Sequence, residues 1–232
     1  MKYFWLSFKA IFVKDIVTEL RAKQVLPTMI VLGMLIVWIL RIASEAATKV
    51  APESPPLIGA AALWIALLFS GLLAQEKSFA TEHQQDCIYA LLLAPVDAAT
   101  IYLAKLLVNV VMLCIFELII VPVVIVFFQL IVPDRWFTLI AVLMLGNIGI
   151  SAVGTLFSAI VQLRGSLLSI VVLVILMPMM IPATSALMML FAPGHSALVP
   201  VSSFASAIKY MIAFDAVFVT ACWLLFGFAI KE

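Results

Sequence analysis

The stretch LAKLLVNVVMLCIFELIIVPVVIVFFQLIV, residues 103–132, decides the fold, because nearly all of its side chains are apolar. A helix needs about 20 mostly apolar residues to cross the hydrocarbon core of a bilayer. Only helices and closed barrels satisfy their backbone polar groups in lipid. The stretch lacks the alternation of polar and apolar residues that is typical of barrel strands. It is therefore predicted to be a transmembrane helix.

Five other stretches have the same character and are predicted to span the membrane as well. In chain order they are Val25–Ile42, Leu57–Ala74, Trp136–Val161, Leu167–Phe191 and Ile208–Ile230. The chain of 232 residues is 66% hydrophobic, whereas a soluble domain is nearer half apolar. A water-soluble fold would have too few polar residues to cover its surface. We therefore expect an all-α membrane protein, with a six-helix domain at residues 25–232 surrounded by the lipid bilayer.

The segment before the first span, residues 1–24, has a different pattern. Its apolar side would carry Trp5, Phe12, Ile16 and Leu20, with Leu6, Val13 and Val17 beside them. Its polar side would carry Lys14, Asp15, Thr18, Glu19 and Arg21. Because aromatic residues dominate the apolar side, the segment is predicted to be an amphipathic helix in the membrane interface. The alternative is an ordinary cytosolic extension of the first span.

The positions of lysine and arginine predict the orientation. With six spans, both termini share one side, which carries nine of the 13 Lys and Arg residues; the other four are Arg41, Lys49, Arg135 and Lys209. Cytoplasmic loops carry an excess of these residues, so both termini are expected in the cytoplasm. The first apolar run has no small-residue cleavage site after it and is expected to stay as an anchor. The net charge of +1, without a basic face or arm, indicates no nucleic-acid partner.

The longest predicted cytoplasmic loop, residues 75–102, has a pattern that suits docking. Its first half is acidic, with Glu76, Glu82 and Asp86, and its second half is apolar until Pro95 ends the segment. A short helix with one charged and one apolar face at the membrane surface suits a contact with a soluble partner. An ordinary amphipathic surface loop is the alternative.

Two polar residues lie inside the third span. Glu117 is near its middle, and Asn109 is eight residues earlier on a similar helical face. Pro122, five residues after Glu117, is expected to kink the helix. Ionisable residues in the membrane are costly and mark function by default. Glu117 either helps to form a substrate path or helix–helix switch, or makes a buried structural hydrogen bond; the second is favoured because the sequence shows no partner.

Small residues and prolines characterise the next two spans. Gly146, Gly149 and Gly154, with Ser151 and Ala152, give the fourth span a small-residue face that permits close helix packing. Pro178 and Pro182 predict that the fifth span is broken or kinked, which membranes tolerate where the helix lines a cavity or packs in protein.

The chain is not expected to be an enzyme. It has no GxxxxGK[ST] phosphate loop with which to bind and hydrolyse ATP. Its three cysteines lie far apart without a metal-binding spacing, so no metal site is expected. A membrane-embedded enzyme would need clustered His, Asp or Glu at the membrane surface, and the sequence does not indicate such a cluster.

In order and spacing, several of these stretches resemble the CcmB family, the membrane subunit of the cytochrome c maturation haem exporter. They are Lys14–Gln24, Leu63–Trp64 through Leu91–Pro95 with Lys105 after it, Gly146–Gly154, Pro178–Pro182, and Asp215 in the last span. The resemblance covers nearly the whole chain. Cys87 departs from the family pattern, in which a small residue, usually glycine, is expected.

The resemblance implies an ABC-2-like permease of the bacterial inner membrane. Its partners would be a separate ATP-hydrolysing subunit similar to CcmA, membrane proteins similar to CcmC and CcmD, and a second copy of itself. Glu76, Glu82 and Asp86 would belong to a coupling loop that receives the motion of the ATPase, and residues 1–24 would be the elbow helix.

Haem would be the transported substrate rather than a firmly bound cofactor. His83 and His195 could ligate haem iron, although a lone loop histidine is more often simply solvated. Two other functions fit the same residues: a permease for another hydrophobic or lipid-like substrate, and a non-transporting scaffold subunit of the haem-handling complex.

Overall fold

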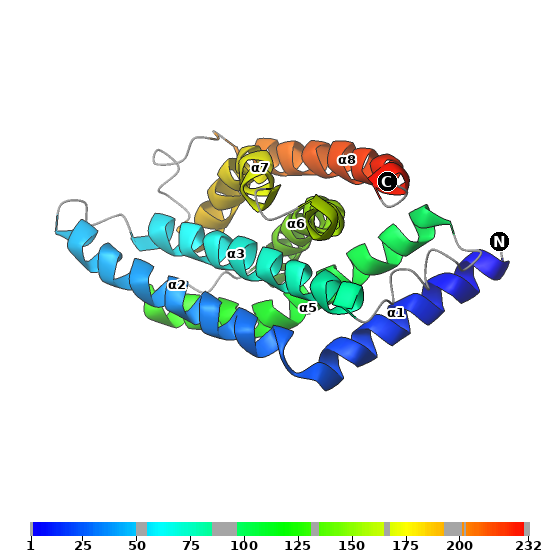
Figure 1. Cartoon of the computed structure of the whole chain (residues 1–232). Coiled ribbons are helices and arrows are strands. Elements are labelled where there is room, and N and C mark those ends of the chain that lie inside the picture. Colours follow the sequence, from blue (N-terminus) through cyan, green and yellow to red (C-terminus); the bar gives the residue numbers. More distant parts are fainter. Residues whose placement is uncertain are drawn as a thin grey trace.

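The computed structural model describes residues 2–49, 55–84, 97–130, 135–164, 168–192, 201 and 203–229. Within these ranges every regular element is a helix (Figure 1): α1 (Lys2–Ala22), α2 (Val25–Thr48), α3 (Pro55–Gln84), α5 (Ala98–Phe127), α6 (Trp136–Arg164), α7 (Leu168–Phe191) and α8 (Phe204–Ala229). The six from α2 to α8 are long and apolar enough to cross a membrane. The predicted fold class, six spans preceded by an amino-terminal helix, is confirmed.

Two helices extend further than the sequence predicted. The predicted loop 75–102 is shorter, because α3 continues to Gln84 and α5 begins at Ala98. Residues 75–84 contain neither glycine nor proline, so nothing in the backbone stops the helix there. The fifth span was predicted to be broken or kinked: α7 is one helix with Pro178 and Pro182 inside it, so it is not broken, and the kink stays a prediction. Neighbouring helices can satisfy the backbone groups that a proline leaves without an intrahelical partner.

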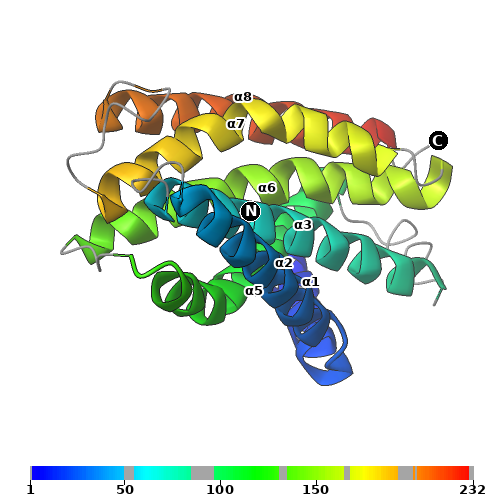
Figure 2. The ribbon, with the colours of Figure 1, turned by 90° about the vertical axis from the view of Figure 1, so that its left-hand side faces the viewer.

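Helix α6 is at the centre of the bundle. It packs against α3, α5, α7 and α8, and both ribbon views place it between α3 and α5 on one side and α7 and α8 on the other (Figures 1 and 2). Its apolar span, Trp136–Ile160, is 72% buried, the largest share among the candidate spans of the described residues. A helix in this position needs small side chains wherever a neighbour approaches closely.

The glycines of α6 provide these close approaches, as the small-residue face predicted. Gly146 faces the indole of Trp64 in α3, and Gly154 faces the side-chain amide of Gln75, further along the same helix. Gly149 points the other way, where a Cβ atom would lie 2.7 Å from Oδ1 of Asp215 in α8. Because Trp64 and Gln75 contact α6 in the same chain order, α3 and α6 run parallel and are held together near both ends of their contact.

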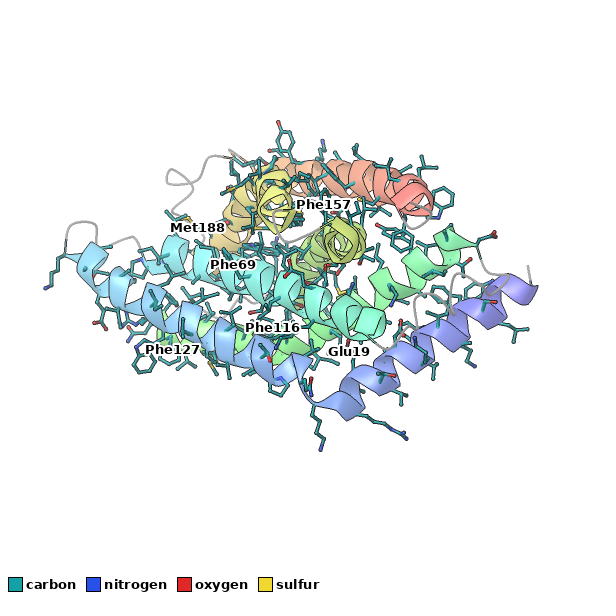
Figure 3. The ribbon with its side chains drawn as sticks, viewed as in Figure 1. Glu19, Phe69, Phe116, Phe127, Phe157 and Met188 are labelled. Atoms are coloured by element: carbon teal, nitrogen blue, oxygen red, sulfur yellow. The ribbon has the colours of Figure 1, made fainter. Side chains whose placement is uncertain are left out.

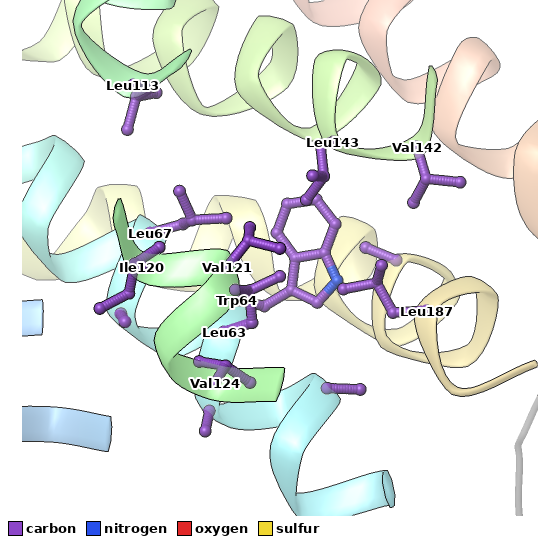
Figure 4. Packing of buried hydrophobic residues seen from close by; sticks show 14 of the residues in the cluster. Leu63, Trp64, Leu67, Leu113, Ile120, Val121, Val124, Val142, Leu143 and Leu187 are labelled. Carbon is purple, nitrogen blue, oxygen red and sulfur yellow. The ribbon is translucent and has the colours of Figure 1, made fainter. Parts of the chain in front are cut away.

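Trp64 is the largest fully buried side chain in the core. Figure 4 shows its indole among apolar side chains from four helices, including Leu143 from α6, Val121 from α5 and Leu187 from α7. On the opposite side of α3, the ring of Phe116 in α5 lies close to Gly33 in α2 (Figure 3). Two contacts between a large aromatic side chain and a glycine therefore join helices of the bundle: one joins α2 to α5, and the other joins α3 to α6.

Helix α1 packs mainly on α5 and makes an angle with α2 (Figure 1). The turn between α1 and α2 includes Lys23, which has a left-handed backbone with φ of 49°. Ile11 is buried against α5, and Phe12 and Ile16 of the predicted apolar face are partly buried against the core. The other residues of that face, Trp5, Leu6, Val13, Val17 and Leu20, are exposed. An exposed apolar face on a helix beside the transmembrane bundle fits the predicted position in the membrane interface.

Candidate functional site

A stripe of polar side chains runs along one face of α6. Asn147, Ser151, Thr155 and Ser158 follow each other at intervals of four, four and three residues, so they share a face, and all four are buried. Polar groups buried at membrane depth need hydrogen-bond partners, because lipid supplies none. This stripe faces α5, and it meets the two polar residues that the sequence placed in the third span.

Asn109 and Glu117 each find a partner on this stripe. The side-chain amide of Asn109 donates to Oγ1 of Thr155 at 2.8 Å. The amide of Asn147 donates to the carboxylate of Glu117, and its nitrogen lies 3.6 Å from the sulfur of Cys114. Both pairs are separated by eight residues on each helix, so two polar contacts join the antiparallel helices α5 and α6.

Glu117 is only half satisfied by Asn147. The side chain is 8% exposed, and Oε1 has no hydrogen-bond partner among the described residues. This unpaired oxygen is itself buried, while the side chain as a whole lines an open groove between α5 and α6.

Asp215, the third intramembrane polar residue, belongs to a different place. It lies in α8 against Gly149, which is on the far side of α6 from Asn147, and the sulfur of Met179 in α7 approaches the same glycine. Asp215 is buried, and neither of its carboxyl oxygens has a hydrogen-bond partner among the described residues. The three predicted polar residues thus form two separate places, one at the α5–α6 contact and one at the junction of α6, α7 and α8.

The structure describes only some of the acidic residues that were predicted to couple the chain to an ATPase. Glu76 is partly buried towards the carboxyl-terminal end of α3, one residue after the buried Gln75. Glu82 and His83 lie in the last turns of α3, but their side chains are outside the described residues, and Asp86, Cys87 and His195 are outside entirely. Within the described part of the chain, no three His, Cys, Asp or Glu side chains are grouped so that they could hold a metal ion.

A buried ion pair was not predicted. The sequence placed Asp15 on the solvated side of α1, and this is wrong: its carboxylate is 3.4 Å from Nζ of Lys105 in α5, and both side chains are 7% exposed. Lys14 also contacts Asp15, at 2.8 Å. Lys105 is one of the few charged residues in an otherwise apolar stretch. A charged residue at such a position indicates an oppositely charged partner on a neighbouring helix, and this was the signal in the sequence for the ion pair.

The Asn109–Thr155 contact gives a testable prediction. Replacing Asn109 by leucine removes the donor and leaves the hydroxyl of Thr155 without it. We expect a loss of about 0.6 kcal/mol, the average for hydrogen bonds between transmembrane helices, and at most about 1.7 kcal/mol. Reversible unfolding in mixed micelles measures this value. Thr155→Val should cost a similar amount, and the double variant should cost less than the sum. Strict additivity would show that the contact contributes nothing.

A comparison with models of known protein families matches residues 6–231, nearly the whole chain, with the family described as CcmB protein. A separate comparison with curated protein sequences finds no match. The matched region begins in α1 and includes all six candidate spans, so it covers both polar places described above.

Proposed function

The chain belongs to the CcmB family, and from this premise we propose that it is the permease subunit of an ATP-driven complex that exports haem, or supports haem delivery, for cytochrome c maturation. The family match over residues 6–231 is the observation that carries the proposal. The six apolar helices agree with a multi-pass membrane protein. Haem is proposed as the transported substrate, and the bacterial inner membrane as the location.

The energy source in this proposal is a separate subunit. The sequence lacks a phosphate-binding loop, so ATP would be bound and hydrolysed by a CcmA-like partner on the cytoplasmic side. CcmC- and CcmD-like membrane proteins, and a second copy of the chain, would complete the complex. With an even number of spans both termini are on one side, and the excess of Lys and Arg there supports a cytoplasmic position.

Helix α3 is the proposed connection between the ATPase and the bundle. It runs without interruption from Pro55 to Gln84, so its acidic end and its buried part are one rigid element. Trp64 and Gln75 anchor it in the glycine slots of α6. A displacement at the docking end of α3 would therefore move α3 and α6 together, which is how ATP hydrolysis could change access across the membrane.

Charge reversal at the docking segment tests this function. We expect the triple variant Glu76→Lys, Glu82→Lys and Asp86→Lys to retain less of the ATPase subunit on co-purification, on the order of tenfold, because like charges would replace complementary ones. Maturation of cytochrome c should fall in parallel. The control Glu45→Lys reverses an exposed acid at the opposite end of the membrane domain and should leave both unchanged.

The same experiment separates transport from scaffolding. If the triple variant loses the ATPase but still supports cytochrome c maturation, the chain is a scaffold rather than an ATP-driven permease. If ATPase retention and maturation are both unchanged, the coupling role of residues 75–86 is wrong.

A further inference from the structure

The outward side of α1 carries a row of exposed residues with a positive charge at each end. Lys9, Val13, Val17 and Arg21 follow each other at intervals of four residues, so they form one line along the helix, and all four are exposed. From Lys9 to Arg21 this line is about 18 Å long. Two cations therefore flank an apolar surface, which is widened by Leu20, whose side chain is 48% exposed.

The acidic residues of α1 are turned inward instead. Asp15 is buried and pairs with Lys105 in α5, and Glu19 is partly buried. Among the α1 side chains that the structure describes, the exposed charged ones are therefore all basic: the two at the ends of the row, and Lys14. The outward side of α1 thus presents positive charge, although the helix as a whole contains residues of both signs.

The turn after α1 lies at the level where two transmembrane helices reach the membrane surface. It contains Lys23, whose side chain is exposed, and the apolar span of α2 begins directly after it, at Val25. The apolar span of α3 ends at Lys77, and Nζ of Lys77 donates to Oγ1 of Thr28 in the first turn of α2 at 3.1 Å. Since α1 leaves this turn at an angle to α2 (Figure 1), it can lie along the membrane surface, where the lipid headgroups are.

We infer that the outward side of α1 and the adjoining turn bind anionic phospholipids, whose phosphate groups contact Lys9, Arg21 and Lys23 while their acyl chains cover the apolar residues of the row. Anionic headgroups complement a surface whose exposed charges are all positive, whereas the choline group of a zwitterionic lipid would bring another positive charge to it. A soluble acidic protein fits less well, because the turn continues directly into α2. The apolar span of that helix is only 22% buried and therefore lies largely in lipid.

Site-specific photocrosslinking to lipid tests the inference. The full chain carries p-benzoylphenylalanine in place of Val17 and is reconstituted in nanodiscs with equal amounts of phosphatidylcholine and phosphatidylglycerol of identical acyl chains. Mass spectrometry then counts the two lipid adducts. At low salt we expect at least about fivefold more phosphatidylglycerol adduct, the gain from a single Lys or Arg near an anionic surface. The same photocrosslinker in place of Val217, which is 61% exposed within the span of α8, should capture the two lipids equally.

Charge variants connect the preference with the basic residues. Lys9→Gln, Arg21→Gln and Lys23→Gln, combined in one chain, should reduce the phosphatidylglycerol excess to the value at the α8 position. All three side chains are exposed, so this variant should fold. Lys9→Arg with Lys23→Arg keeps the charges and should keep the preference. Lys209→Gln removes an exposed cation near the opposite membrane surface and should leave the preference unchanged. Salt at about 1 M, which shortens the Debye length to about 3 Å, should act like the triple glutamine variant.

Equal capture of the two lipids at Val17, or an unchanged preference in the triple glutamine variant, would overturn the inference. An absence of lipid adducts at Val17 alongside normal adducts at Val217 would overturn it as well, because it would place this side of α1 outside the membrane and indicate a soluble acidic partner instead. The experiment uses neither ATPase nor haem, so its failure would leave the proposed function to be decided by the charge-reversal variants. Equally, the lipid preference would stand even if the transported substrate proved to be another molecule.

Discussion

Gly146→Leu is expected to destabilise the transmembrane bundle by about 3 kcal/mol, the upper part of the usual range for overpacking a core. The new side chain would need the space that the Trp64 indole fills, and even a Cβ atom on residue 146 would overlap that ring. Trp64 cannot move aside easily, because it is 1% exposed and enclosed by side chains of α3, α5, α6 and α7. Thermal unfolding in detergent, followed by circular dichroism, should show a clearly lower midpoint.

A second-site change identifies the cause. Trp64→Ala in the Gly146→Leu background removes the ring that causes the overlap, and it should recover part of the lost stability. The matched control is Gly227→Ala in α8, where the nearest other atom, Cβ of Ala98, would be 3.8 Å from the new Cβ. That variant should be close to neutral. If Gly146→Leu were as stable as Gly227→Ala, the close contact between α3 and α6 would be wrong.

Lys105→Met is expected to weaken the attachment of α1 to the bundle by about 3 kcal/mol, the lower end of the range for breaking a buried ion pair. It removes the cross-helix cation beside Asp15, whose side chain is 7% exposed. The effect should stay at the lower end because Lys14 remains at 2.8 Å from the same carboxylate. Unfolding midpoints measure the stability, and the rate of proteolysis within α1 reports on its detachment.

The neighbouring lysine provides the control for this pair. Lys14→Met removes a side chain that is 45% exposed, so its ion pair with Asp15 should contribute less than about 1 kcal/mol. Asp15→Asn combined with Lys105→Met removes both charges and should be less damaging than the sum of the single variants. Equal effects of Lys14→Met and Lys105→Met would contradict a special role for the buried contact between α1 and α5.

The two groups of polar residues inside the bundle differ in their hydrogen bonding. At the α5–α6 contact, Asn109 contacts Thr155 and Glu117 contacts Asn147, and Oε1 of Glu117 is buried without a hydrogen-bond partner among the described residues. At the junction of α6, α7 and α8, Asp215 is buried near Gly149, and neither of its carboxyl oxygens has a hydrogen-bond partner among the described residues. The first place therefore joins two helices by side-chain contacts, whereas the second leaves its carboxyl group without such a contact in the described part of the chain.

The sequence by itself determined the six spans, the amphipathic helix before them and the small-residue face of α6. Each of these depends on the composition of one continuous segment, because a helix in lipid satisfies its backbone within itself. It also indicated Glu117 and Asn109 as polar residues on one face. Where a helix ended was less certain: the polar residues 75–84 looked like a loop, but they lack a residue that stops α3.

Only the tertiary structure decided which faces meet. The sequence shows that Asp15 is acidic but not whether its side chain is exposed or buried. Its pairing with Lys105 depends on how α1 crosses α5. The same is true of Asn147 and Glu117, which are 30 residues apart, and of Trp64 in the slot at Gly146. These contacts join helices distant in sequence, and lipid-facing and protein-facing sides are equally apolar, so the hydrophobic pattern that reveals a span does not reveal its neighbour.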